Sequence, residues 1–290
     1  MAGPAGPSTI GLLFDKDDQP VNEGGPTTVW QARMEFDQAP PGSEDSVEDV
    51  VVKNREYWLR INGCHELPAL KIDGENNFAF YRGEMADFVF RDVKNRDHGQ
   101  TFDEAELVWD YLFSGSLRKE DGAIVYTEPE RRREGDKVCI ALADNCTYGW
   151  VNGERVKLPA KSLLWQKLKY HGLHGGAKVR GEYCMVPASF LAETVGASYT
   201  ESEGWAEMGL KDGRVLQFAR GCIGCTVDNR VCAMLCEPIE RSGMLYISGE
   251  WFCREVLNWH VSTCGHVLYA TDHYSLLSVN MARLIRDLLR

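Results

Sequence analysis

Long apolar runs and an excess of positive charge are both missing from this sequence of 290 residues. No apolar run approaches the roughly 18 residues that suggest a membrane-spanning helix, so we expect no membrane span. Acidic residues number 43 and basic residues 32, which gives a formal net charge of -11. A nucleic-acid-binding domain normally carries a basic surface, so we expect no nucleic-acid partner. The acidic balance favours solubility instead.

The beginning of the chain lacks the features of a secretory leader. The stretch MAGPAGPSTIGLLFDKDD has neither a basic segment nor a long apolar segment, so it is not typical of a signal peptide. The lack of a leader normally suggests a cytoplasmic protein. That inference does not hold if the chain is a piece of a longer protein.

Cysteine, in contrast, is abundant, with ten residues in the chain. Four of them form CIGCTVDNRVCAMLC, with the spacing C-x2-C-x6-C-x3-C. A structural zinc site needs ligands that converge tetrahedrally, whereas this segment alternates like a strand and contains no second knuckle turn. We therefore expect no metal and no cofactor. Buried free thiols and a disulfide both remain open for these four cysteines.

The first half of the sequence reads as strands and helices around a polar loop that carries His98. We expect a helix near residues 45–62, strands in LPALKID, NFAFYRG and DFVFRDV, and a further helix after His98. Thr101 and Glu104 have the spacing of a capping box at the start of that last helix. An apolar stripe with helical spacing follows at Ala105, Val108, Trp109 and Leu112.

A charge-rich stretch with glycine and proline, SGSLRKEDGAIVYTEPERRREGDK, separates the two halves of the chain. We expect residues 1–120 to form the first domain and residues 121–136 to form a linker. Residues 137–272 then form the second domain, and residues 273–290 form an amphipathic C-terminal helix.

The second domain contains a weak internal repeat with a period of about 61 residues. Each copy reads as strands followed by a helix, and Val186 in the first copy corresponds to Ile247 in the second. Pro187 suits the first position of the first helix, and Gly196 suits its end. Ser248 is the expected N-cap of the second helix.

Three segments of the second domain carry a family resemblance: VNGERVKLPA, VRGEYCMVPASFLAETVGASYTESEGWAEMGL and VDNRVCAMLCEPIERSGMLYISGEWFCREVL. With these segments, residues 137–272 resemble the copper amine oxidase N-terminal-like stalk domain of bacterial surface and secreted proteins. The resemblance implies tandem α+β repeats that serve attachment or binding. It implies no copper, because the stalk module is not the copper site of that family. It also favours an extracellular or cell-surface location, which the chain's own sequence leaves unknown.

Two segments of the first domain carry a second resemblance. TIGLLFDKDDQPVNEGG reads as a strand with an acidic turn, and FVFRDVKNRDHGQTFDEAELVWDYLF reads as a strand, a histidine loop and a helix. They are similar to the C-terminal end of an α/β-hydrolase of the esterase and polyhydroxybutyrate-depolymerase-like kind, whose triad follows the order Ser, Asp/Glu, His. The resemblance implies His98 as the general base and Asp18 as the acid, with Asp17 as the nearest rival.

The serine nucleophile of such an enzyme is missing from this sequence. The elbow motif G-x-S-x-G does not occur, so the catalytic nucleophile stays unknown and the chain alone should not hydrolyse esters. The expected fold class is an α/β partial hydrolase-like region plus α+β tandem stalk-like repeats. The expected function is the acid and histidine part of an esterase that acts on an ester or polymer, with the nucleophile supplied by a missing N-terminal region or a second chain. The alternative is a non-catalytic scaffold or binding protein of the bacterial cell surface.

Three further groups of residues attract attention. His171, His174 and Lys178 lie in YHGLHGGAK, which could bind a phosphate or carboxylate or supply two metal ligands, or could simply be a polar loop. The adjacent Cys64 and His65 suggest a thiol nucleophile, but neighbouring side chains on an extended segment point apart. The tryptophans of the second half suggest carbohydrate stacking, although their spacing favours packing in the core.

Overall fold

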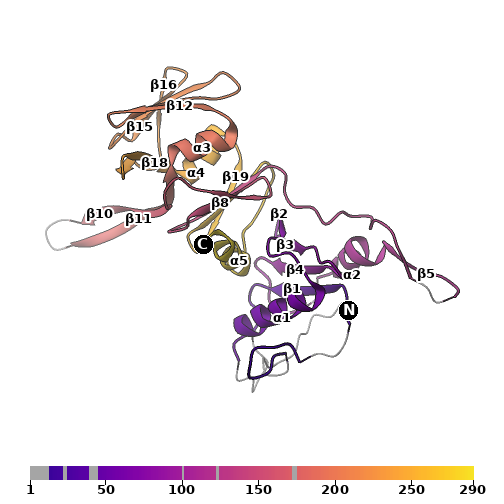
Figure 1. Cartoon of the computed structure of the whole chain (residues 1–290). Helices are drawn as coiled ribbons and strands as arrows, with labels where there is room; N and C mark the ends of the chain where they lie inside the picture. Colours follow the sequence, from indigo (N-terminus) through magenta and orange to yellow (C-terminus); the bar gives the residue numbers. More distant parts are fainter. Residues whose placement is uncertain (1–12, 22–24, 39–44, 100, 122–123, 172–174) are drawn as a thin grey trace. The chain divides into compact units, whose positions relative to one another are not determined.

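The computed structural model describes residues 13–21, 25–38, 45–99, 101–121, 124–171 and 175–290 (Figure 1). They fall into two compact units, Met1–Asp136 and Lys137–Arg290. Strands account for 41% and helices for 21%, in several antiparallel sheets and a half-barrel. The expected fold class, an α/β hydrolase-like region plus α+β repeats, is therefore wrong. Neighbouring apolar segments pair mainly as antiparallel strands joined by turns, and parallel strands joined by helical crossovers are the exception.

The first unit is built on a four-stranded sheet in the order β1-β4-β3-β2. β1 and β4 are parallel and end side by side at Met34 and Val93, whereas β3 is antiparallel to β4 and to β2. The strands span Val29–Met34 (β1), Ala69–Asp73 (β2), Asn76–Tyr81 (β3) and Phe88–Val93 (β4). A separate hairpin is formed by β5 (Ser116–Arg118) and β6 (Ile124–Tyr126).

Helix α1 (Val47–Asn62) connects β1 to β2 and confirms the helix expected near residues 45–62. It begins at Ser46, whose side chain accepts a hydrogen bond from the backbone of Asp49, and it ends at Gly63 in the left-handed conformation. These are the two residue types that most often cap helices at those ends, because one supplies an acceptor and the other tolerates a positive φ.

The helix expected after His98 is present as α2 (Glu104–Val108), which continues into the π-helical turn η2 (Trp109–Phe113). Its buried face packs against one face of the sheet, on side chains from β1, β3 and β4. The buried helical residues are Leu107, Val108, Tyr111 and Leu112. The expected stripe is therefore correct at Val108 and Leu112, but Ala105 and Trp109 are exposed.

The end of the first unit, which the sequence suggested as a linker, packs against that unit. Arg133 forms an ion pair with Asp87 at 2.6 Å. Asp136 donates its backbone N–H to Leu70 and accepts the backbone N–H of Ile72 at 3.0 Å, so this segment continues the edge of the sheet beyond β2.

The second unit contains three sheets, in the orders β19-β20-β7-β8-β9, β10-β11-β18-β17 and β12-β13-β14-β15-β16. The first comprises β7 (Cys139–Ala143), β8 (Tyr148–Val151), β9 (Glu154–Lys157), β19 (His260–Cys264) and β20 (Val267–Thr271). The second comprises β10 (Leu163–His171), β11 (Gly175–Pro187), β17 (Ile239–Arg241) and β18 (Met244–Ser248). The third comprises β12 (Ser198–Ser202), β13 (Trp205–Gly209), β14 (Val215–Ala219), β15 (Gly224–Val227) and β16 (Arg230–Ala233).

The internal repeat of the sequence is visible where β11 meets β18. Val186 and Ile247, the residues that correspond in the two copies, are direct antiparallel partners. Each strand then leads into a helix, α3 (Ala188–Val195) in the first copy and α4 (Gly249–Trp251) with η3 (Phe252–Val256) in the second. The strand-to-helix parts of the two copies therefore pair antiparallel, whereas the hairpins before them, β8–β9 and β15–β16, lie in different sheets.

The expected caps of these helices are largely confirmed. Gly196 ends α3 in the left-handed conformation, and the Ser248 side chain accepts the backbone N–H of Trp251 at the start of α4. Pro187 stands at the N-cap of α3, one residue earlier than predicted. The C-terminal helix α5 (Val279–Leu289) packs on β7 and β20.

Candidate functional site

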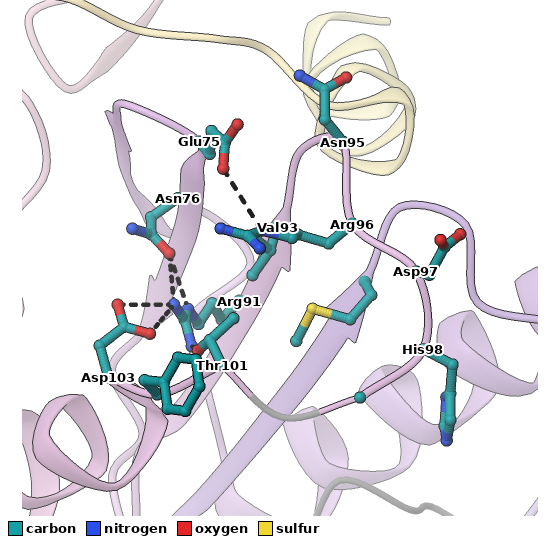
Figure 2. Close-up of a pocket in the computed structure, with 13 residues that line it drawn as sticks. Glu75, Asn76, Arg91, Val93, Asn95, Arg96, Asp97, His98, Thr101 and Asp103 are labelled. Carbon is teal, nitrogen blue, oxygen red and sulfur yellow. Dashed lines mark hydrogen bonds and ion pairs between the residues drawn. The ribbon is translucent and has the colours of Figure 1, made fainter.

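A hollow of about 580 Å³ lies at the carboxyl end of the parallel pair β1 and β4 (Figure 2). Its walls come from the ends of these strands, the start of β3 and the loop that runs from Val93 to α2. A smaller hollow of about 130 Å³ adjoins it and shares Met34, His98 and Gly99 with it. Polar loops at the carboxyl ends of parallel strands are a common place for a functional site.

His98 lies in this loop with its ring directed away from the Arg91 side of the hollow (Figure 2). Its Nδ1 is 2.8 Å from Oδ1 of Asp37, a residue just beyond β1. The Asp37 carboxylate is 17% exposed and the His98 ring is 82% exposed. No other described residue lies within hydrogen-bonding distance of the ring, so the Nε2 atom faces solvent.

Asp37 is held by the turn that ends β1. Its Oδ2 accepts the backbone N–H of Met34 at 2.8 Å, and its own N–H donates to the Met34 carbonyl. A carboxylate held by a backbone N–H cannot rotate freely. The turn therefore fixes the oxygen that faces His98.

Glu35 joins this turn to the histidine loop. Its side chain, only 2% exposed, accepts hydrogen bonds from Lys94 Nζ at 2.8 Å and from the backbone of Asn95 at 2.9 Å. The backbone of Phe36 also donates to the carbonyl of Arg96. These contacts hold the acid turn and the loop that leads to His98 together.

Arg91 forms the other wall of the hollow and is 1% exposed (Figure 2). Its guanidinium donates to Asn76 Oδ1, to Thr101 Oγ1 at 3.0 Å and to both carboxylate oxygens of Asp103 at 3.2 Å, and it also contacts Glu104. Burial alone would raise the pKa of Asp103. The hydrogen bond to Thr101 and the charge of Arg91 outweigh it, so that the pKa lies below its ordinary value.

The structure does not bring the predicted acid residues to His98. Asp18 forms ion pairs with Arg60 at 3.1 Å and with Lys53 at 3.6 Å, both on α1. The hydrogen bond from Arg60 lowers the pKa of Asp18, against a smaller opposing effect of burial. Asp17 takes part in a local turn through its backbone, which donates to Asp15.

Asp37 is the site residue that the sequence reasoning missed. It lies in the polar, proline- and glycine-containing stretch EFDQAPPGSEDSVED, which is typical of a surface loop. The available signal was its position three residues after β1, since His98 likewise follows β4 by only five residues. That signal has meaning only when the two strands are known to be parallel neighbours.

A nucleophile is not part of the described hollows. Their described lining contains no serine and no cysteine, and the single hydroxyl, that of Thr101, accepts from Arg91. Cys64 is not an activated thiol, because burial raises its pKa to about 11. His174, one of the residues suggested to bind a phosphate or a metal ion, lies outside the described residues. Among the residues that the structure does describe, no three His, Cys, Asp or Glu side chains are arranged to hold a metal ion.

None of the protein-family models, curated proteins or solved structures compared with the chain matches it. Among the described residues, no helix has both the length and the apolar character needed to cross a membrane.

Proposed function

We propose that the first unit supplies the general base and the acid of a serine-dependent ester hydrolase, with His98 as the base and Asp37 as the acid. The observation that carries this proposal is the 2.8 Å contact between His98 Nδ1 and Asp37 Oδ1, which leaves Nε2 facing solvent. Asp37 replaces Asp18 and Asp17 in this role. The serine comes from a region not included in this sequence or from a second chain.

The contact between Asp37 and His98 suits His98 to take and return a proton. A carboxylate beside Nδ1 keeps the neutral imidazole in the tautomer with its proton on Nδ1, and it stabilises the imidazolium that forms later. The lone pair on Nε2 is then available to take the proton of an approaching hydroxyl. Asp37 also precedes His98 in the chain, which is the order of acid and base in hydrolases with a strand-end triad.

The tautomer of His98 provides a direct test of the pair. In chain labelled with ¹⁵N-histidine, the neutral His98 ring should carry its proton on Nδ1. In Asp37→Asn, the side-chain amide can donate to Nδ1, so the proton should move to Nε2. An Nε2-protonated ring in the unmodified chain, or no change in the variant, would show that Asp37 does not orient the base.

The catalytic role requires a test that supplies the missing nucleophile. N-acetylserinamide provides a hydroxyl, and p-nitrophenyl acetate provides the acyl group. The chain should accelerate acetyl transfer to the hydroxyl, and His98→Ala should lower the acceleration by about 100-fold, the lower end for a positioned general base.

His266→Ala is the matched control, since His266 also lies near carboxylates, those of Glu182 and Asp144, but belongs to the second unit. It should leave the transfer rate unchanged. Equal rates for the chain and His98→Ala would rule out the proposal and favour the non-catalytic alternative. A fluorophosphonate probe should label no serine of the chain, and a labelled serine would show that the nucleophile lies within it.

A further inference from the structure

The strands β10 and β11 form a long two-stranded ribbon in the second unit. In β11, only Met185–Pro187 pairs with β18, so no other strand of the described residues lies beside the outer part of the ribbon. Figure 1 shows this part extending away from the three sheets of its unit. Residues 175–180 of β11 are all exposed. The outer ribbon therefore contributes little to the core of the unit.

The ribbon is basic although the chain as a whole is acidic. Residues 163–187 contain one carboxylate, that of Glu182, and four cationic side chains, whereas the full chain has a net charge of -11. The four cations are Lys167, Lys169, Lys178 and Arg180. Glu182 accepts a hydrogen bond from Gln166 and lies 3.4 Å from His266.

The cations of the ribbon are not paired with carboxylates of the described part of the fold. Among the described residues, no carboxylate forms an ion pair with any of the four, and Lys167 donates only to the carbonyl of Leu235. Lys169 and Lys178 are direct cross-strand partners and therefore lie on one face. Like charges in that position destabilise a strand pair. An arrangement that costs stability and has no carboxylate partner among the described residues suggests an external anionic partner.

The spacing on this face further defines the partner. Lys167 lies two residues from Lys169 on the same strand, so the two cations are about 7 Å apart along the ribbon. Gly181 lies opposite Lys167, and the hydroxyl end of Tyr183 lies over this glycine. The face thus presents the ring of Tyr183 followed by a row of cations. Aromatic rings with a polar end are suited to contacts with sugars.

We propose that this face of the β10–β11 ribbon binds an anionic polysaccharide whose carboxylates are spaced by sugar rings. The lysines would contact the carboxylates, and Tyr183 would contact a sugar ring. A nucleic acid fits less well, because a nucleic-acid-binding domain normally carries a basic surface and this chain has a net charge of -11. This inference does not depend on the proposed catalytic role of His98.

The test uses the full chain and immobilised polygalacturonate as the uronate polymer. We expect saturable binding that weakens as salt is raised from about 50 to about 200 mM, as for contacts made by exposed charges. Lys169→Glu/Lys178→Glu should weaken binding by about tenfold or more, since it removes two attractions and adds two repulsions. Lys169→Gln/Lys178→Gln should weaken it less.

The matched control is Lys157→Glu/Lys211→Glu, which makes the same charge change at two exposed lysines of the same unit. It should change the affinity by less than about twofold. Binding of a single-stranded oligothymidylate as tight as that of polygalacturonate would overturn the assignment to a polysaccharide. Equal losses in the ribbon and control variants, or no binding to polygalacturonate, would overturn the role of the ribbon. Unchanged circular dichroism of each variant shows that it is folded.

Discussion

Replacing Arg91 by methionine should strongly destabilise the first unit. Arg91 is 1% exposed, and its partner Glu104 is 13% exposed. Glu104, the first residue of α2, also accepts the indole N–H of Trp30, so its carboxylate is held against the sheet. Methionine fills much of the space of arginine but offers no donor. The variant therefore leaves a largely buried carboxylate without its cation.

The expected loss is large compared with the stability of a domain. Removing one partner of a buried ion pair costs about 3–5 kcal/mol, whereas a domain is stable by about 5–15 kcal/mol. Glu104→Gln should cost less, about 1.5–3 kcal/mol, because Arg91 keeps Asn76, Thr101 and Asp103 and the glutamine can still accept from Trp30. The double variant should cost about 2 kcal/mol less than the sum of the single changes, because it leaves no buried charge unpaired at position 104.

Native-state hydrogen exchange of the backbone amides in β3 and β4 would measure these effects. These strands are the inner pair of the first unit's sheet, so their slowest amides report the free energy of unfolding of that unit rather than of the whole chain. A cost below about 1 kcal/mol for Arg91→Met would contradict the reasoning. So would strictly additive single and double variants, since Arg91 and Glu104 would then not be coupled.

Two further predictions concern the second unit. Burial raises the pKa of Glu250 above its ordinary value of 4.5, so the folded unit binds a proton more tightly than the unfolded chain. The stability of the second unit should therefore fall as the pH rises from 4.5 through the raised pKa. Urea titrations between pH 4 and 7 should show this fall. An equally steep fall in Glu250→Gln would refute the prediction. Iodoacetamide at pH 8 should modify the exposed Cys222 and Cys232 first. It should spare Cys184 and Cys253, whose pKa values burial raises, and mass spectrometry that finds these two modified in the native state would contradict their burial.

Helix ends could be read from the sequence because the signal lies within a few residues. Ser248 and Gly196 cap their helices through contacts with residues three or four positions away. The predicted capping box at Thr101 and Glu104 is wrong, because contacts outside the helix replace the local ones. Both side chains are turned toward Arg91, and α2 begins without a side-chain cap. A contact with a distant strand outweighed the local preference.

The acid of the candidate site could not be read from the sequence. Asp18 and Asp37 both follow short apolar stretches, and nothing local distinguishes them. The distinction depends on the parallel pairing of β1 with β4, which are separated along the chain by α1 and a β-hairpin. Pairings between such distant segments are fixed by the packing of the whole unit. The candidate histidine could be selected from the sequence because its loop and its helix are adjacent to it.

The order of strands in the second unit has a consequence for how the chain folds during synthesis. β7 starts this unit, and its neighbours in the sheet are β8, which follows soon after, and β20, which lies near the end of the chain. Synthesis proceeds from the N-terminus. One edge of β7 therefore stays unpaired until β20, near the end of the unit, has left the ribosome. The first unit can complete its sheet long before that. The second unit must close its sheet in a late step, and a chain that stops before β20 exposes an apolar strand edge that is prone to aggregation.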